Sequence, residues 1–279
     1  MKIKYLGTSA AEGVPALFCF CDVCKKSAEA GGRNIRTRSQ AVIDDKLLID
    51  FPADTYLHIL NYGLNLKEVQ HCLITHAHPD HLYPLDIDMR RGCFAYPKTP
   101  NGHIPLTFYA SKKSGEGIVR IIEDNRLDEK ANVRFQRVKP FEPFEAGGYI
   151  ATALKADHAR ELEPVFYAVS DGKKTLLYAH DTGYFPEDTW EYLERTKPYF
   201  DFVSLDCTGC VFNYRQGHMG IDTCTEVKNR LLEIGVADDK TVWCLHHFSH
   251  NGLVTYDEFV PEAEKKGFLV SYDSMEYEF

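Results

Sequence analysis

The stretch His76-Ala77-His78-Pro79-Asp80-His81 decides the fold. It holds four potential metal ligands within six residues and directly follows the apolar run 69–75. That run predicts a short strand, so the four side chains would lie on a loop at its end, where a rigid scaffold presents functional groups. Imidazole and carboxylate ligands suit zinc, manganese or iron better than calcium or magnesium. A polar surface loop with chance histidines is the alternative, and it leaves so dense a pattern unexplained.

Other polar residues follow apolar runs in the same way, namely His158, Asp181, Asp206 and His247. Strand patterns dominate the chain, and helical patterns are interspersed among them. The expected strands cover residues 2–6, 41–50 as a hairpin, 69–75, 106–109, 133–138, 149–156, 165–170, 175–178, 202–205, 241–245 and 268–270. The expected helices cover residues 54–62, 114–123, 186–196, 221–232 and 256–266. With no repeat and no linker, residues 1–279 are expected to form a single α/β domain in which helices cover the sheets.

The run Cys19-Phe20-Cys21-Asp22-Val23-Cys24 places three thiols within six residues. A structural zinc needs four ligands, so a fourth must come from elsewhere, and we expect it to be His250. The alternative is three free thiols on a loop. A further close pair, Cys207 and Cys210, is interpreted as buried thiols rather than as a redox pair or a rival zinc site.

Composition limits the partners of the protein. The 279 residues carry a formal net charge of −9, which argues against sequence-independent binding to nucleic acid. A small phosphorylated substrate is compatible with this charge, because bound metal ions can supply positive charge. Nine cysteines cannot all pair within the chain, and clustered cysteines in a reducing compartment indicate metal binding.

The N-terminal residues 1–7 show no signal-peptide pattern, and no apolar run approaches the roughly 18 residues that span a bilayer. We therefore expect a soluble, cytoplasmic protein without a membrane partner. The sequence leaves the oligomeric state open, a homodimer included.

The run from His76 to His81 resembles the HxHxDH signature of the metallo-β-lactamase superfamily. The resemblance extends over nearly the whole chain, because 156–158, 177–183 and 244–250 are similar to the segments that carry the remaining metal ligands of that superfamily. It implies an α/β fold of the αββα sandwich type, with two mixed β-sheets flanked by helices.

The resemblance also implies a dinuclear site of two divalent ions (Zn, Mn or Fe) that activate a shared hydroxide for hydrolysis. His180 and His246 compete with their neighbours as ligands. Strand alternation would point His180 the other way, and the pattern His-Phe-Ser-His favours His247 over His246. The implied ligands are His76, His78 and His158 for one ion, Asp80, His81 and His247 for the other, and Asp181 as the bridge.

The stretches 13–15, 19–24 and 36–39 narrow the resemblance to one branch of the superfamily. That branch holds the phosphoribosyl cyclic phosphodiesterase of phosphonate breakdown, a carbon–phosphorus lyase accessory protein, and relatives of the pyrroloquinoline quinone biosynthesis protein. Within it, the cysteine cluster and a distant histidine bind one structural zinc. The roles of Arg36 and Arg38, at the Cys loop or at a phosphate, stay open.

Gly217-His218-Met219-Gly220 precedes the helical pattern from Ile221, so His218 lies in a local field that favours an anionic group. Phosphodiesterase members of the superfamily carry a histidine near the substrate phosphate here. The resemblance therefore makes His218 catalytic, together with Asp80, as a group that binds the phosphate or protonates the leaving alkoxide. The alternative is an ordinary loop histidine. We also expect the segment 83–113 to shape the substrate pocket.

These observations predict metal-dependent hydrolysis of a small phosphodiester, a cyclic one included. Three alternatives stay in view: a tRNA 3′-processing nuclease, a thioesterase or lactonase on the same fold, and a non-catalytic biosynthetic accessory protein. The other histidines without a partner pattern, His58, His71 and His103, are expected to be structural or at the surface.

Overall fold

The computed structural model describes residues 1–279 and consists of two seven-stranded sheets that face each other. The first sheet has the strand order β14-β1-β2-β3-β4-β5-β6 and the second β13-β12-β11-β10-β9-β8-β7. The first sheet comprises β1 (Lys2–Gly7), β2 (Gln40–Ile43), β3 (Leu47–Ile49), β4 (His71–Leu73), β5 (Leu106–Ala110), β6 (Val133–Arg137) and β14 (Glu276–Glu278). The second comprises β7 (Pro143–Ala146), β8 (Tyr149–Lys155), β9 (Val165–Ser170), β10 (Thr175–Ala179), β11 (Phe202–Asp206), β12 (Val242–His246) and β13 (Leu269–Val270).

Side-chain alternation explains why both faces of each sheet are covered. In β2, Ala41 and Ile43 point into the core between the sheets, whereas Val42 points to the outer face. In β10, Tyr178 belongs to the inner core and Leu177 to the outer one. Because successive side chains alternate, a strand that is apolar throughout must be buried on both faces.

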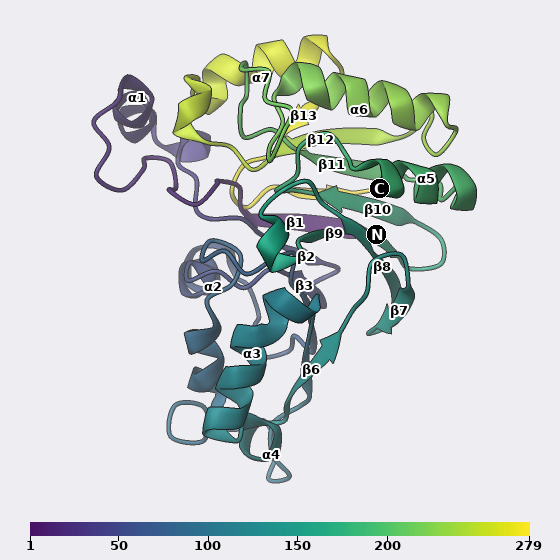
Figure 1. Ribbon diagram of the computed structural model, residues 1–279. Helices are drawn as coiled ribbons and strands as arrows, with labels where there is room; N and C mark the ends of the chain where they lie inside the picture. The colour runs from purple at the N-terminus through teal and green to yellow at the C-terminus, as the bar shows by residue number, and fades with distance from the viewer.

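Helices cover the two outer faces (Figure 1). One outer core packs the first sheet against α3 and α4, and the other packs the second sheet against α5, α6 and α7. The result is a four-layer αββα sandwich, as expected from the sequence. The helices are α1 (Asp22–Ala30), α2 (Thr55–Tyr62), α3 (Lys112–Asn125), α4 (Leu127–Ala131), α5 (Glu187–Thr196), α6 (Ile221–Glu233) and α7 (Tyr256–Lys265).

Both sheets are mixed. The strands from β3 to β6 run parallel in the first sheet, and those from β10 to β13 run parallel in the second. The remaining neighbours pair antiparallel. Parallel strands present their carboxyl ends at one edge of a sheet, which is where open α/β sheets bind ligands.

Every strand and helix expected from the sequence is present, and no end differs by more than two residues. Four elements were not expected: α1, α4, β7 and β14. No helix of the structure combines the length and the apolar character that crossing a membrane requires.

Candidate metal centre

The candidate ligands lie where strands end. The loop after β4 carries the run 76–81, and the segment after β8 carries His158. Asp181 lies two residues after the end of β10, and His247 directly follows β12. Asp181 and His247 have backbone φ angles of 49° and 62°, and Asp50, after β3, has 66°. Such left-handed backbone is uncommon outside glycine and clusters at functional sites, where it redirects a side chain at a strand end.

The first donor group consists of His76, His78, His158 and Asp181. The Nδ1 atom of His78 lies 2.9 Å from Nε2 of His76 and 3.1 Å from Nε2 of His158. Asp181 joins through its Oδ2 atom, 3.2 Å from Nε2 of His76. Three imidazoles and a carboxylate therefore converge on one small volume.

The second donor group consists of Asp80, His81, Asp181 and His247. Nε2 of His81 lies 2.7 Å from Oδ2 of Asp181, 3.3 Å from Oδ2 of Asp80 and 3.2 Å from Nε2 of His247. Asp181 belongs to both groups. The structure therefore brings all seven expected ligands together in two sets with a shared carboxylate.

The donor geometry fits metal ions. Two nitrogens bound about 2.0–2.1 Å from one tetrahedral zinc lie about 3.3–3.4 Å apart, close to the separations observed here. In the neutral form each imidazole offers one lone pair, and facing lone pairs repel each other unless a cation or a proton lies between them. In addition, Oδ1 of Asp181 is buried and makes no hydrogen bond, although a buried carboxylate oxygen normally has a partner.

The protonation states of His76 and Asp181 also suit ligation. Burial opposes protonation of His81 and His247, but Asp181 and other nearby carboxylates raise the pKa of both rings, so a bound ion would displace a proton there. Burial, together with the charge of His81, lowers the pKa of His76 well below its usual value, so this imidazole is neutral. Burial opposes ionisation of Asp181, but His247 and His81 hold its pKa well below the usual range. Neutral imidazoles and ionised carboxylates are the forms that bind metals.

Partners behind the ligands fix their orientation. Oδ2 of Asp50 accepts a hydrogen bond from Nδ1 of His81 at 2.7 Å, and Oδ1 of Asp50 accepts from the Thr75 amide at 2.8 Å. Nδ1 of His158 donates to the Gly217 carbonyl at 3.0 Å. These bonds turn Nε2 of each ring toward the site, as is usual for metal-binding histidines. Sequence reasoning missed Asp50, although it follows the apolar run Leu47–Ile49 and so carries the same strand-end signal as the ligands.

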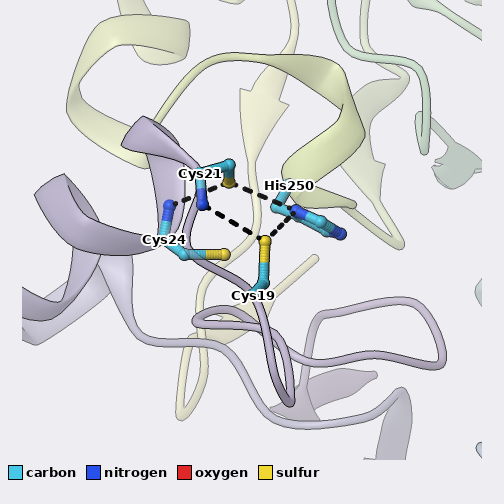
Figure 2. Close-up of side chains that lie close together, drawn as sticks. All are labelled: Cys19, Cys21, Cys24 and His250. Carbon is cyan, nitrogen blue, oxygen red and sulfur yellow. Dashed lines mark hydrogen bonds between the residues drawn. The ribbon is translucent and has the colours of Figure 1, made fainter.

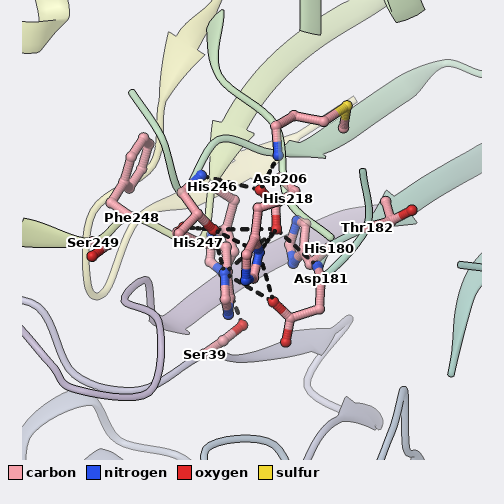
Figure 3. Close-up of polar contacts among 12 residues, drawn as sticks. Ser39, His180, Asp181, Thr182, Asp206, His218, His246, His247, Phe248 and Ser249 are labelled. Carbon is pink, nitrogen blue, oxygen red and sulfur yellow. Dashed lines mark hydrogen bonds and ion pairs between the residues drawn. The ribbon is translucent and has the colours of Figure 1, made fainter. Parts of the chain in front are cut away.

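His218 lies next to the second donor group (Figure 3). Its Nδ1 atom lies 3.1 Å from Oδ2 of Asp206, 3.3 Å from Oδ1 of Asp181 and 3.2 Å from the Thr208 hydroxyl. Burial alone would lower the pKa of His218, but Asp206 and Asp181 raise it to about 9. The Thr208 hydroxyl also shares a hydrogen bond of 2.9 Å with Nδ1 of His247, so Thr208 links His218 to the ligand set.

The two competing histidines lie outside both groups. His180 and His246 are fully buried and stack on each other, with ring centroids 4.0 Å apart. Nε2 of His180 bonds the Ser204 hydroxyl at 2.7 Å, and Nε2 of His246 bonds that of Ser39 at 3.1 Å. Strand alternation therefore places both rings in the core between the sheets.

A cavity of about 340 Å³ opens over the donor groups. No residue of the segment 83–113 lines it, so the expectation that this segment shapes the pocket was wrong. Ile87 of that segment is buried in the outer core with α3 and α4, whereas Leu85, Met89, Phe94 and Tyr96 are exposed and do not line the cavity. The lining residues are Ala10, Ala11, Glu12, His78, Asp80, His158, Asp181, Thr208, Tyr214, His218, His247, Ser249 and Asn251.

Neither arginine of the segment 36–39 lines this cavity. Arg36 is buried, donates to the Thr8 hydroxyl at 2.7 Å and to the Ser271 carbonyl at 2.8 Å, and stacks on Phe248. Arg38 pairs with Asp54 at 2.9 Å.

The cysteine cluster forms a separate group with His250 (Figure 2). The sulfurs of Cys19 and Cys21 each lie 3.4 Å from Nδ1 of His250. A sulfur and a nitrogen on one tetrahedral zinc lie about 3.5–3.6 Å apart, so the four residues fit this ion. Burial raises the pKa of Cys24 to about 12, and the neighbouring sulfurs of Cys21 and Cys19 raise it further. A bound cation would stabilise the Cys24 thiolate and so oppose this rise.

Cys21 also begins α1, because its side chain accepts from the Cys24 amide at 3.4 Å. Burial opposes ionisation, but this amide and His250 lower the pKa of Cys21 to about 6. A thiolate at a helix N-terminus is favoured by the helix dipole. Elsewhere, Cys207 and Cys210 are free and buried, as expected.

The remaining histidines lie outside the donor groups. His58 is buried and bonds Gln40 at 2.6 Å, whereas His71 is half-buried and bonds Tyr109 at 2.9 Å. His103 has a buried ring nitrogen without a partner.

Two mixed sheets packed face to face, with histidine and aspartate ligands gathered at strand ends, define the metallo-β-lactamase class of metal-binding hydrolases. The sequence model described as "Beta-lactamase superfamily domain" matches residues 52–247, which is well over half of the chain. The chain therefore belongs to the β-lactamase superfamily.

Solved structures with the same fold include a diphosphatase from the PhnP family, with a TM-score of 0.75 and 22% identity over 100% of this chain and 97% of that one. Another is Zn²⁺-bound PqqB from Methylobacterium extorquens, with a TM-score of 0.69 and 19% identity over the full length of both chains. These likenesses confirm the fold.

Two curated relatives match over shorter stretches. An octanoyltransferase of Porphyromonas gingivalis (strain ATCC BAA-308 / W83) is 27% identical over 166 residues, which is 57% of this chain and 31% of that protein. Exodeoxyribonuclease YycJ of Bacillus anthracis is 28% identical over 121 residues, which is 43% of this chain and 39% of that protein. The matched part thus spans about a third of the length of these relatives.

Proposed function

We propose that this protein is a dinuclear-metal-dependent phosphodiesterase that acts on a small phosphodiester, either linear or cyclic. One observation carries the proposal: two donor groups share Asp181, and the His218 imidazole lies 3.3 Å from that same carboxylate at the edge of one cavity. Sites of this kind suit displacement at phosphorus, because two ions can stabilise both the entering and the leaving oxygen.

The chain supplies the ligands in two sets. His76, His78 and His158 would hold one ion, Asp80, His81 and His247 the other, and Asp181 would bridge them. Zinc, manganese or iron in these positions supplies Lewis acidity and an activated water. His81 and His247 hold the pKa of Asp80 below its usual value despite burial, so this carboxylate stays ionised beside the reacting phosphate.

His218 would protonate the leaving oxygen. Its Nδ1 atom bonds Asp206, which orients the ring and favours the imidazolium, so that Nε2 is the atom that can donate. Its side chain is 30% exposed and lines the cavity, so the donor is accessible to a substrate. General-acid help of this kind contributes roughly 10²–10⁴-fold.

The names of two relatives support phosphorus chemistry, since one is a diphosphatase and the other an exodeoxyribonuclease. The chain itself favours a small substrate over a nucleic acid. Its net charge is −9, and neither lysine nor arginine lines the cavity, whereas a backbone of many phosphates needs a positive surface. The cysteine group with His250 would hold one structural zinc. This ion would stiffen the cavity wall formed by Ser249 and Asn251, the neighbours of His250 in the chain.

A substrate panel tests the proposal. The protein is reconstituted with zinc or manganese and assayed with bis(p-nitrophenyl) phosphate, a 2′,3′-cyclic nucleotide, an acyl thioester and a lactone. We expect turnover of the phosphodiesters, lost in Asp181→Asn, and little of the other two. Turnover of the thioester or the lactone well above that of the diesters would overturn the proposal, as would diester turnover that survives Asp181→Asn.

A further inference from the structure

One wall of the cavity lies directly against the cysteine group. It consists of Ala10, Ala11 and Glu12 from the first loop and of Ser249 and Asn251 from the loop after β12. Glu12 joins the two loops, because its Oε1 atom accepts a hydrogen bond from the Ser249 hydroxyl and lies 3.6 Å from Nε2 of His250. The other ring nitrogen of His250 faces the sulfurs of Cys19 and Cys21.

Only one oxygen of the Glu12 carboxylate is occupied. Oε1 has the contacts with Ser249 and His250, whereas Oε2 has no hydrogen-bond partner and no ion pair. The side chain is 28% exposed and lines the cavity. A carboxylate held on one side in this way has its second oxygen free for a group that enters the cavity.

Neither lysine nor arginine lines the cavity, and the His218 imidazole, which does line it, pairs with Asp206 and Asp181 and not with Glu12. Arg38 comes near, because its Nε atom donates to the Ala11 carbonyl at 2.8 Å, but its guanidinium pairs with Asp54 at 2.9 Å. Arg36 is buried, bonds Thr8 and Ser271, and does not line the cavity.

The positive charge of bound metal ions would be neutralised by groups other than a second anion of the substrate. Asp80 and Asp181 neutralise part of it, and the reacting phosphodiester carries a further negative charge. A second anionic group on the substrate would therefore enter a cavity in which Glu12 repels it and no lysine or arginine offers a counter-charge. A cationic or uncharged group would not meet this repulsion.

We propose that Glu12 is a specificity-determining residue, which selects phosphodiesters whose second ester group is cationic or uncharged over those that carry a second anion. This inference rests on the proposed phosphodiesterase function and names its substrate class. Like-charge juxtaposition is a common way to exclude the wrong partner.

Three p-nitrophenyl phosphodiesters of similar size test the inference. Their second ester groups are 2-(trimethylammonio)ethyl, 3,3-dimethylbutyl and 3-carboxypropyl, so that the first two differ only in charge. We expect kcat/KM to fall in this order, with a ratio of roughly tenfold or more between the cationic and the anionic ester. Glu12→Gln should bring that ratio close to one, whereas Glu12→Asp should keep the order because it keeps the charge.

Glu123→Gln is the matched control, because Glu123 is an exposed residue of α3 that does not line the cavity. It should keep the wild-type ratio. If Glu12 had only a structural role, Glu12→Gln would lower kcat/KM for all three esters by the same factor. That result overturns the inference. A wild-type protein that treats the three esters alike, or that prefers the anionic one, overturns it as well.

The binding step separates this inference from the proposed function. If none of the esters is hydrolysed, the phosphodiesterase proposal fails. Dissociation constants of the same esters, measured by calorimetry with the unreactive protein, then still report the charge order. The cationic ester should bind more tightly than the anionic one in wild type but not in Glu12→Gln, and equal binding in wild type contradicts the role of Glu12.

Discussion

Asp181 is the residue at which the chemistry of the site converges, because both donor groups and His218 contact it. The sequence alone predicted this convergence for the seven ligands, since each follows a strand pattern and falls in a known motif. It did not predict Asp50. The side chain of Asp50 orients His81 from behind, and a single carboxylate after an apolar run has no spacing partner that would distinguish it from a surface aspartate.

At the same scale, His218→Ala should slow hydrolysis most where the leaving group is poor. An alkyl leaving oxygen needs a proton in the transition state, whereas p-nitrophenolate leaves with little help. We expect kcat to fall by roughly 10²–10⁴-fold for a 2′,3′-cyclic nucleotide, whose leaving oxygen is an alkoxide, and by far less for bis(p-nitrophenyl) phosphate, which releases p-nitrophenolate. The measurement compares kcat for both leaving groups at an unchanged metal content. Equal losses for the two would exclude proton donation by this residue.

At the scale of elements, the sequence predicted the strands that carry an apolar run. The missed strands have little burial: in β7 only Ala146 is buried, and in β14 no residue is. Without an apolar run or clear alternation, such edge strands have no pattern to detect. α1 was missed for another reason, because the run 19–24 overlaps its first turn and was interpreted as metal ligands rather than as the start of a helix.

The cysteine group should hold α1 in place. Cys21→Ser removes one ligand, so the ion at this group should be lost and the amides of residues 16–30 should exchange hydrogen faster, while the two ions at the candidate active site stay bound. Hydrogen exchange with mass spectrometry and metal analysis check both points. Cys93→Ser serves as the control, because Cys93 is an exposed free thiol outside the group. Unchanged exchange and metal content in Cys21→Ser would show that the group holds no structural ion.

At the scale of the whole molecule, stability should depend on pH through His58. Burial lowers the pKa of His58 to about 4, and its ring bonds Gln40 and Thr37. Below about pH 6.5 the unfolded chain takes up a proton that the folded chain refuses until about pH 4, so stability falls as the pH drops through this window. The loss approaches about 1.4 kcal/mol per pH unit. Urea unfolding at pH 7 and pH 5 should show a steeper fall for wild type than for His58→Gln, by about 2 kcal/mol. Parallel curves would rule out this contribution.

The α/β class was predictable because strand and helix patterns are periodic, whereas the two-sheet αββα arrangement was implied by the resemblance to the metallo-β-lactamase superfamily. The cavity was not predictable, because its walls come from loops that approach only in the folded chain, such as residues 10–12 and 249–251. The segment 83–113 shows the same limit, since its sequence does not reveal whether it lines the cavity or lies elsewhere on the surface.

Metal content tests the central claim most directly. The measurement is the number of ions per chain, by inductively coupled plasma mass spectrometry, in protein loaded with zinc and freed of excess metal. The two donor groups and the cysteine group predict about three ions in wild type. Asp181→Ala, which removes the shared ligand, should retain about one. A wild-type chain with one ion at most, or an Asp181→Ala chain that still binds three, would contradict the dinuclear centre.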